Sequence, residues 1–211
     1  MEKGIALAMK DHYLGQHLVE GDLESFELIK EGHGHGQGYI RFLFDCNDST
    51  LIVTGDYGDA VFKWYSSRNT LDQIAEYSTD LRYFVGKCTA SSRVTYVYDE
   101  NQAKKDIAEW LDNMGISDDD FGIDSDQVYW PWDNKQDFIN DLVSNIDYYR
   151  GFSFDNVNAN SFSDISEESL QRIAEDWWEV VYDFGKIVNP VFELYSHALN
   201  LGVKWLKRQK A

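Results

Sequence analysis

The sequence predicts an α+β protein with an N-terminal antiparallel β-sheet and helices, followed by an acidic helical C-terminal half. Three observations lead to this fold class. Short β-rich runs separated by turn residues occupy the first third of the chain, helical patterns dominate after residue 98, and most of the net charge of −18 lies in that second part. We expect one lobe over 1–98 and an acidic, mainly helical lobe over 99–211, with a boundary near residue 155 as the alternative.

The N-terminal part should contain one helix followed by a sheet. Apolar residues within 2–19 recur at roughly helical spacing, so we expect an amphipathic helix that ends near Gly21. Gly, Asn and Asp residues then separate several β-rich runs, and these residues tolerate the backbone of tight turns. The pattern predicts an antiparallel meander of about four strands, at 26–29, 39–44, 51–54 and 60–65.

The remaining chain is expected to be largely helical. Thr70 or Asp72 can cap a short helix that ends at Tyr77, and a second short helix should cover 80–87. Residues 94–98 fit a strand or an extended connector. From Asp99 onward one apolar face, which includes Met114, predicts a helix that ends at Gly115. Three further helices are expected at 133–150, 166–184 and 190–207, with a flexible connector at 151–163.

The acidity is regional. Residues 99–183 carry 22 Asp and Glu against five Lys and Arg, a net charge of −17. Aromatic residues are interleaved with these acids, so the region should fold rather than form a disordered tail. A folded anionic surface repels nucleic acid and anionic membranes and attracts basic grooves. We therefore expect a basic protein partner, no direct contact with nucleic acid and no membrane association.

The helical spacing of the acids suggests a binding face. Carboxylates three or four residues apart on a helix lie about 5 to 6 Å apart, close to the spacing of phosphates along a strand. Such a face would act as a DNA mimic, whereas the alternative is a solvated surface that only keeps the protein soluble. The carboxylates expected to bind the partner are Asp118, Asp119, Asp120, Asp124, Asp126, Asp133, Asp137, Asp141, Glu175, Asp176 and Glu179.

A second candidate site lies in the glycine-rich segment 31–38. His33 and His35 alternate with glycines, and this spacing places two imidazoles on one side of an extended strand. Together with the thiols of Cys46 and Cys88 they would suit a structural zinc ion, although nothing in the sequence brings the four residues together. The alternative is a glycine-rich hairpin whose histidines face solvent. Two further histidines could complete the shell, His12 and His17.

One stretch of the chain resembles a known group of proteins. The run LIVTGDYGDAVFKW at 51–64, followed by LRYFVGKC at 81–88, resembles small accessory proteins of phages and prophages of Gram-positive bacteria. The match covers about residues 25–150 and supplies no catalytic residues. The resemblance implies a setting in which acidic proteins without an enzyme signature inhibit host defence, as anti-CRISPR proteins that act on Cas9 do.

Charge and resemblance together predict a phage-encoded inhibitor of a CRISPR nuclease such as Cas9. It would bind a basic surface that handles nucleic acid and would block loading, as a monomer or a homodimer. The alternative is a metal-dependent phage enzyme that uses the His33 and His35 region. No catalytic triad stands out, so we expect no enzymatic activity and no required cofactor. Two cysteines and no apolar run of membrane-spanning length predict a protein of the bacterial host cytoplasm.

Overall fold

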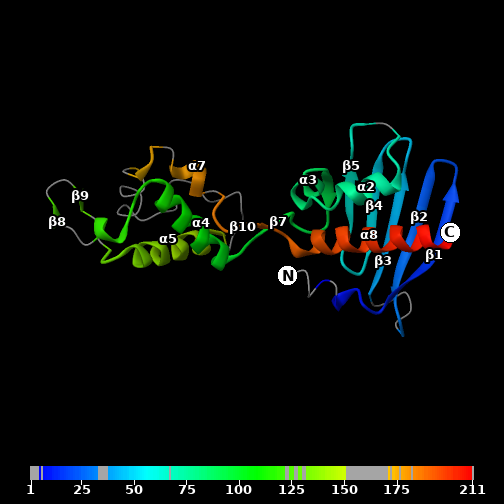
Figure 1. Ribbon diagram of the computed structural model, residues 1–211, viewed down its shortest axis with the longest axis horizontal. Coiled ribbons are helices and arrows are strands. Elements are labelled where there is room, and N and C mark those ends of the chain that lie inside the picture. The colour runs from blue at the N-terminus through cyan, green and yellow to red at the C-terminus, as the bar shows by residue number, and fades with distance from the viewer. Residues whose placement is uncertain are drawn as a thin grey trace. The chain divides into compact units, whose positions relative to one another are not determined.

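The chain forms two compact units, Met1–Thr95 with Val188–Ala211 and, separately, Tyr96–Ile187. A computed structural model describes their elements (Figure 1). It covers residues 5, 7–32, 38–66, 68–121, 124–125, 128–129, 132–150, 171, 173–175, 177–181 and 183–210. An antiparallel sheet and a set of helices are both present, so the predicted α+β class is confirmed.

The first unit is built on a six-stranded antiparallel sheet in which consecutive strands are hydrogen-bonded neighbours. The four strands predicted as a meander are all present. In β3, Ile40, Phe42 and Phe44 are buried while the intervening residues are more exposed, as expected for a sheet with one covered face. The strands are β1 (His12–Glu20), β2 (Leu23–Lys30), β3 (Tyr39–Asp45), β4 (Thr50–Gly55), β5 (Ala60–Lys63) and β6 (Cys88–Ser91).

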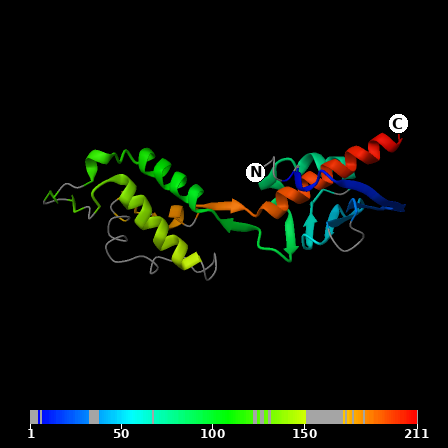
Figure 2. The same cartoon turned by 90° about the horizontal axis from the view of Figure 1, so that it is seen from below.

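The helices that the structure describes in full in the first unit are α2 (Leu71–Tyr77), α3 (Leu81–Val85) and α8 (Pro190–Lys210). The predicted cap of α2 is confirmed, because the Thr70 side chain and Gln73 form a capping box. Helix α8 runs along the sheet and packs on β2 (Figure 2). At Gly202 the approach is so close that a Cβ atom would lie 2.0 Å from a ring carbon of Phe26.

The predicted helix over 2–19 is wrong for most of its length. Residues His12–Glu20 form β1, which pairs with β2 and carries an irregularity between Leu14 and His17. The apolar residues of this segment are too few to distinguish the two periodicities. Hydrogen bonds to the neighbouring β2 decide the outcome, since tertiary pairing overrides local helical preference. Within the described residues, only Ile5, Leu7 and Ala8 keep a helical conformation.

The second unit is centred on two helices, α4 (Glu100–Asn113) and α5 (Lys135–Arg150), which pack against each other. Of the predicted helix at 166–184, the structure describes α7 (Trp177–Val181), while 151–170 lies outside the described residues. Smaller elements complete the unit. They are β7 (Tyr96–Tyr98), the 3₁₀ turn η1 (Asp118–Asp120), β8 (Asp124–Ser125), β9 (Val128–Tyr129) and β10 (Lys186–Val188), with β7 paired to β10 and β8 to β9.

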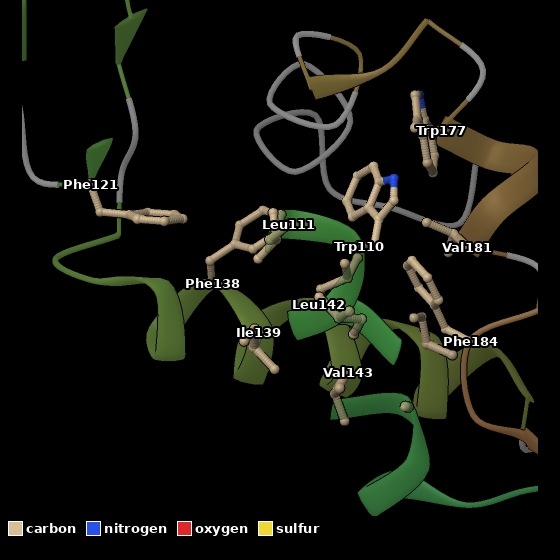
Figure 3. Packing of buried hydrophobic residues seen from close by; sticks show 13 residues of the cluster. Trp110, Leu111, Phe121, Phe138, Ile139, Leu142, Val143, Trp177, Val181 and Phe184 are labelled. Atoms are coloured by element: carbon tan, nitrogen blue, oxygen red, sulfur yellow. The ribbon is translucent and has the colours of Figure 1, made fainter. Parts of the chain in front are cut away.

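The core of the second unit joins α4, α5 and α7 (Figure 3). Trp110 of α4 lies 5.6 Å from Phe184, and Phe138 of α5 lies 4.7 Å from Trp132, measured between ring centroids. The buried face predicted for α4 is confirmed at Ala103, Ile107, Trp110 and Leu111. Met114, which we placed on the same face, is instead 46% exposed because the helix ends before it.

The domain organisation differs from the expected division at 98/99. The C-terminal segment 188–211 belongs to the first unit, whereas the sequence pattern placed it in the acidic lobe. Its apolar face includes Phe192, Ala198 and Leu199, all fully buried. Burial against the sheet therefore determines where this helix belongs. In the described part of the chain, no helix is long and apolar enough to cross a membrane.

Gly202→Ala should lower the free energy of unfolding by about 1 to 3 kcal/mol, because the added methyl group meets the ring of Phe26. That ring stacks on Phe42 at 5.0 Å and is fully buried, so it has no room to move away. Urea unfolding measures the change, with the exposed Lys204→Ala as a control on the same helix. The second substitution Phe26→Leu should recover part of the loss. A neutral Gly202→Ala would contradict the packing.

His12 should make stability depend on pH. Its side chain is 5% exposed, and burial lowers its pKa below 6.5, with Lys30 adding to the effect. As the pH falls, the unfolded chain therefore takes up the proton before the folded protein does. The contribution of His12 to stability is fully present above about pH 6.5 and decreases as the pH drops below that value. His12→Leu should reduce the difference between urea midpoints at about pH 7 and pH 5. An equally large difference in His12→Leu would show that His12 does not cause the pH dependence.

Candidate functional site

Nearly all of the net negative charge lies in the second unit. Residues 96–187 hold 22 acidic and 6 basic residues, a net charge of −16. The first unit holds the other 15 acidic and 13 basic residues, a net charge of −2. The acidic candidate surface therefore belongs to a single folded unit, and the other unit is close to neutral.

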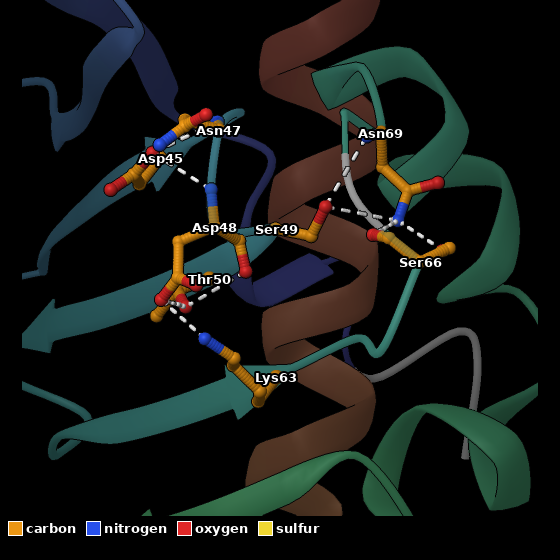
Figure 4. Close-up of polar contacts among 8 residues, drawn as sticks. All are labelled: Asp45, Asn47, Asp48, Ser49, Thr50, Lys63, Ser66 and Asn69. Carbon is orange, nitrogen blue, oxygen red and sulfur yellow. Dashed lines mark hydrogen bonds and ion pairs between the residues drawn. The ribbon is translucent and has the colours of Figure 1, made fainter.

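In the first unit, several acids serve the local fold, as the turn between β3 and β4 illustrates (Figure 4). Asp45 accepts hydrogen bonds from the backbone N–H groups of Asn47 and Asp48, at 2.9 and 3.2 Å. The carboxylate of Asp48 pairs with Lys63, which lowers the pKa of Asp48. These carboxylates are occupied, so they contribute little to a surface for a partner.

Helix α4 displays one set of carboxylates because its other face is buried. Asp99 caps the helix by accepting a hydrogen bond from the backbone of Gln102 at 2.8 Å. Asp106 is half-buried and accepts a hydrogen bond from the backbone N–H of Gly185 at 2.8 Å. It therefore joins α4 to the turn before β10. Glu109 is exposed and has no hydrogen bond or ion pair with another described residue.

The three consecutive aspartates of η1 are exposed but play different roles. Asp118 accepts a hydrogen bond at 3.1 Å from the backbone N–H of Lys135, the first residue of α5. Asp120 accepts hydrogen bonds from the backbone and hydroxyl of Ser117, at 2.7 and 2.9 Å, and these lower the pKa of Asp120. Within the described residues Asp119 has no such partner. Two of the three aspartates thus hold the corner between α4 and α5.

The start of α5 uses another acid locally. Asn134 accepts a hydrogen bond from the backbone N–H of Asp137 at 2.9 Å and donates one to its carboxylate at 2.8 Å. Asp133 is exposed and, among the described residues, makes no hydrogen bond or ion pair. Asp141 is half-buried and is not free, because it interacts with another part of the protein. Asp137 and Asp141 are therefore less available to a partner than their spacing in sequence predicts.

Lysines neutralise three further acids of the second unit. The ion pairs are Lys104 with Glu100 at 2.6 Å, Lys135 with Asp112 at 2.5 Å and Lys186 with Asp183 at 3.0 Å. Five exposed acids of this unit remain without a hydrogen bond or ion pair to any other described residue. We call them the open carboxylates: Glu109, Asp119, Asp133, Glu175 and Glu179.

The predicted binding face is only partly described. Asp126 and Asp176 lie outside the described residues, and for Asp124 the structure describes the backbone of β8 but not the side chain. The predicted set of binding carboxylates did not include Glu109, which is one of the open carboxylates. Its place on the exposed face of α4 follows from the buried positions Ile107 and Trp110, so helical periodicity could have identified it.

The proposed zinc ligands are also only partly described. His33 and His35 lie outside the described residues. The thiol of Cys46 donates to Asp22 at 3.6 Å, and that of Cys88 donates to the carbonyl of Ala90 at 3.3 Å. Burial raises both thiol pKa values, and Asp22 raises that of Cys46 further. In the described part of the chain, no three His, Cys, Asp or Glu residues are placed to hold a metal.

Comparisons with protein-family models, with curated proteins and with solved structures find no match to this chain. The resemblance of 51–64 and 81–88 to phage accessory proteins therefore stays a prediction. The arrangement of the residues carries the functional argument. Its main feature is a folded unit with a large negative charge and several carboxylates that are not neutralised.

Asp118→Ala should destabilise the second unit by about 0.5 to 2 kcal/mol, because α5 loses a carboxylate that accepts its first backbone N–H. Asp119→Ala removes the same charge from the neighbouring position and should change stability by less than about 0.5 kcal/mol. Urea unfolding followed by tryptophan fluorescence compares the two, since five of the seven tryptophans lie in this unit. Equal effects would show that Asp118 has no capping role.

Proposed function

We propose that this protein inhibits a bacterial CRISPR nuclease, such as Cas9, by binding a basic surface that handles nucleic acid. The observation that carries the proposal is the set of open carboxylates. They belong to a unit with a net charge of −16, and no lysine, arginine or backbone donor among the described residues neutralises them. Such a surface favours a partner of opposite charge.

The helices of the second unit support binding by a fixed surface. Glu109 lies on a helix that is anchored by four buried residues, and Asp119 lies in a turn whose neighbours are hydrogen-bonded on both sides. A surface held in this way loses little conformational freedom on binding. Mutual repulsion among the acids, at a few tenths of a kcal/mol for each helical pair, would be relieved by a basic partner.

The class of partner follows from the same charge. A Cas9-type nuclease holds its RNA–DNA duplex in a positively charged channel and recognises the backbone geometry rather than the sequence. A rigid array of carboxylates can occupy such a channel without any chemical step. The resemblance to phage accessory proteins supplies the biological setting, a protein that acts in the cytoplasm of a bacterial host. The proposed role is occlusion and not enzymatic catalysis.

The order in which the components meet should determine inhibition. Purified Cas9 is mixed with this protein before guide RNA, before target DNA or after both, and cleavage of the target is measured. We expect strong inhibition when the protein precedes the blocked loading step and little when it follows that step, because the basic channel is then occupied. Complete cleavage in every order would reject Cas9 as the target.

Neutralising open carboxylates should weaken binding to the nuclease by about tenfold or more, mainly through slower association, because opposite charges steer the encounter. Surface plasmon resonance at low and physiological salt measures this effect. The test variant carries four substitutions, Glu109→Gln, Asp119→Asn, Glu175→Gln and Glu179→Gln. It leaves Asp118 and Asp120 intact, so the corner between α4 and α5 is preserved.

A matched control changes the same number and types of residue in the first unit. All four control positions are exposed. The control variant carries Asp11→Asn, Glu20→Gln, Glu31→Gln and Glu76→Gln. It should bind nearly as tightly as the unmodified protein. If both variants lose affinity equally, total charge and not the open carboxylates determines binding, and the proposed surface is wrong.

A further inference from the structure

The first unit carries a group of tyrosines around one lysine. Tyr65 follows β5, Tyr83 lies on α3 and Lys87 follows α3. The Lys87 ammonium lies 4.6 Å from the ring centroid of Tyr83 and 5.8 Å from that of Tyr65. Tyr77, at the end of α2, packs edge-on against Tyr83 with ring centroids 5.9 Å apart. One cation therefore lies between two aromatic rings that come from different elements.

These rings are unusually open to solvent. Tyr65 is 93% exposed and Tyr83 is 42% exposed. The backbone that carries these rings is nevertheless well anchored. The carbonyl of Lys87 accepts a hydrogen bond from the backbone of Lys63 at 2.9 Å, and Phe84 beside Tyr83 is fully buried. The exposed aromatic surface thus projects from a firmly packed part of the unit and is not a product of a frayed chain end.

The charge of Lys87 is not neutralised within the described residues. Two lysines of this unit have carboxylate partners, Lys63 with Asp48 and Lys207 with Asp72. Lys87 forms no ion pair or side-chain hydrogen bond there, and its aromatic contacts are those to the two tyrosines. An anionic group of a ligand can pair with this ammonium. A flat ring next to that anion can stack on the exposed face of Tyr65.

We propose that Tyr65, Tyr83 and Lys87 bind single-stranded nucleic acid. A base stacks on the open ring of Tyr65, and the Lys87 ammonium, which lies over the Tyr83 ring, contacts a neighbouring phosphate. Sequence-independent single-strand sites combine stacking and cationic contacts in this way. Tyrosine is enriched and lysine is depleted at the centres of protein interfaces, so it is the unpaired Lys87 that favours a phosphate over a protein partner. The acidity that repels nucleic acid lies in residues 99–183, whereas this site belongs to the unit whose net charge is −2.

Binding of labelled oligothymidylate, measured by fluorescence anisotropy on the full chain, tests the proposal. Tyr65→Ala should weaken binding at least about fivefold, since one stacked base is lost. The side chain of Tyr65 is almost fully exposed, so the protein should fold normally, which circular dichroism verifies. The logarithm of the binding constant falls linearly with the logarithm of the salt concentration. Lys87→Gln should make this slope shallower by about 0.7, the contribution of one phosphate contact.

Two controls separate this site from general attraction. Tyr13→Ala removes a tyrosine that is 50% exposed on β1 and should not change binding. An abasic strand of equal length keeps the phosphates but lacks the bases, so it should bind at least about fivefold more weakly than oligothymidylate. No binding of oligothymidylate, equal affinity for the abasic strand, or equal effects of Tyr13→Ala and Tyr65→Ala would each overturn the proposal.

Discussion

The packing of aromatic side chains between α4, α5 and α7 is the constraint on which the acidic surface depends. In a unit with a net charge of −16 the carboxylates repel one another, and this repulsion opposes the compact state. Burial of Trp110, Phe138 and Trp177 provides the opposing gain, at about 25 cal/mol for each Å² of apolar surface removed from water. Without this core, the carboxylates would have no fixed positions to present to a partner.

The acids of the second unit divide into two groups with different consequences. Asp99, Asp106, Asp118 and Asp120 satisfy backbone donors at helix ends and turns. Their negative charge is favourable at these places, because unpaired N–H groups at the start of a helix attract anions. The open carboxylates have no such local function. The proposed function therefore rests on fewer residues than the total charge suggests, namely the exposed acids that have no hydrogen bond or ion pair to another described residue.

The first unit, in contrast, has nearly equal numbers of acidic and basic residues. Several of its acids are engaged in turns and ion pairs, and the sheet is covered by α8, whose Gly202 touches Phe26. Its notable surface is aromatic, with Tyr65 and Tyr83 beside a lysine that lacks a carboxylate partner within the described residues. The two units thus offer surfaces of different chemistry, one rich in carboxylates and one with exposed tyrosines beside a lysine.

The sequence by itself determined those features that a few neighbouring residues encode. Short β-rich runs between turn residues located β2 to β5, Thr70 was one of the two predicted caps of α2, and the buried face of α4 followed from its periodicity. The concentration of acidic residues in 99–183 also follows from the sequence alone. These signals are local, because side-chain direction repeats every two residues in a strand and every 3.6 in a helix.

Only the tertiary structure decided the rest, because the deciding contacts join residues that are distant in the chain. Pairing with β2 made 12–20 a strand, and burial on the sheet assigned α8 to the first unit. For the candidate site, the sequence indicated the region but not which carboxylates are open. Asp118 is occupied by a backbone donor 17 residues away and Asp106 by one 79 residues away, and no local pattern reveals such partners.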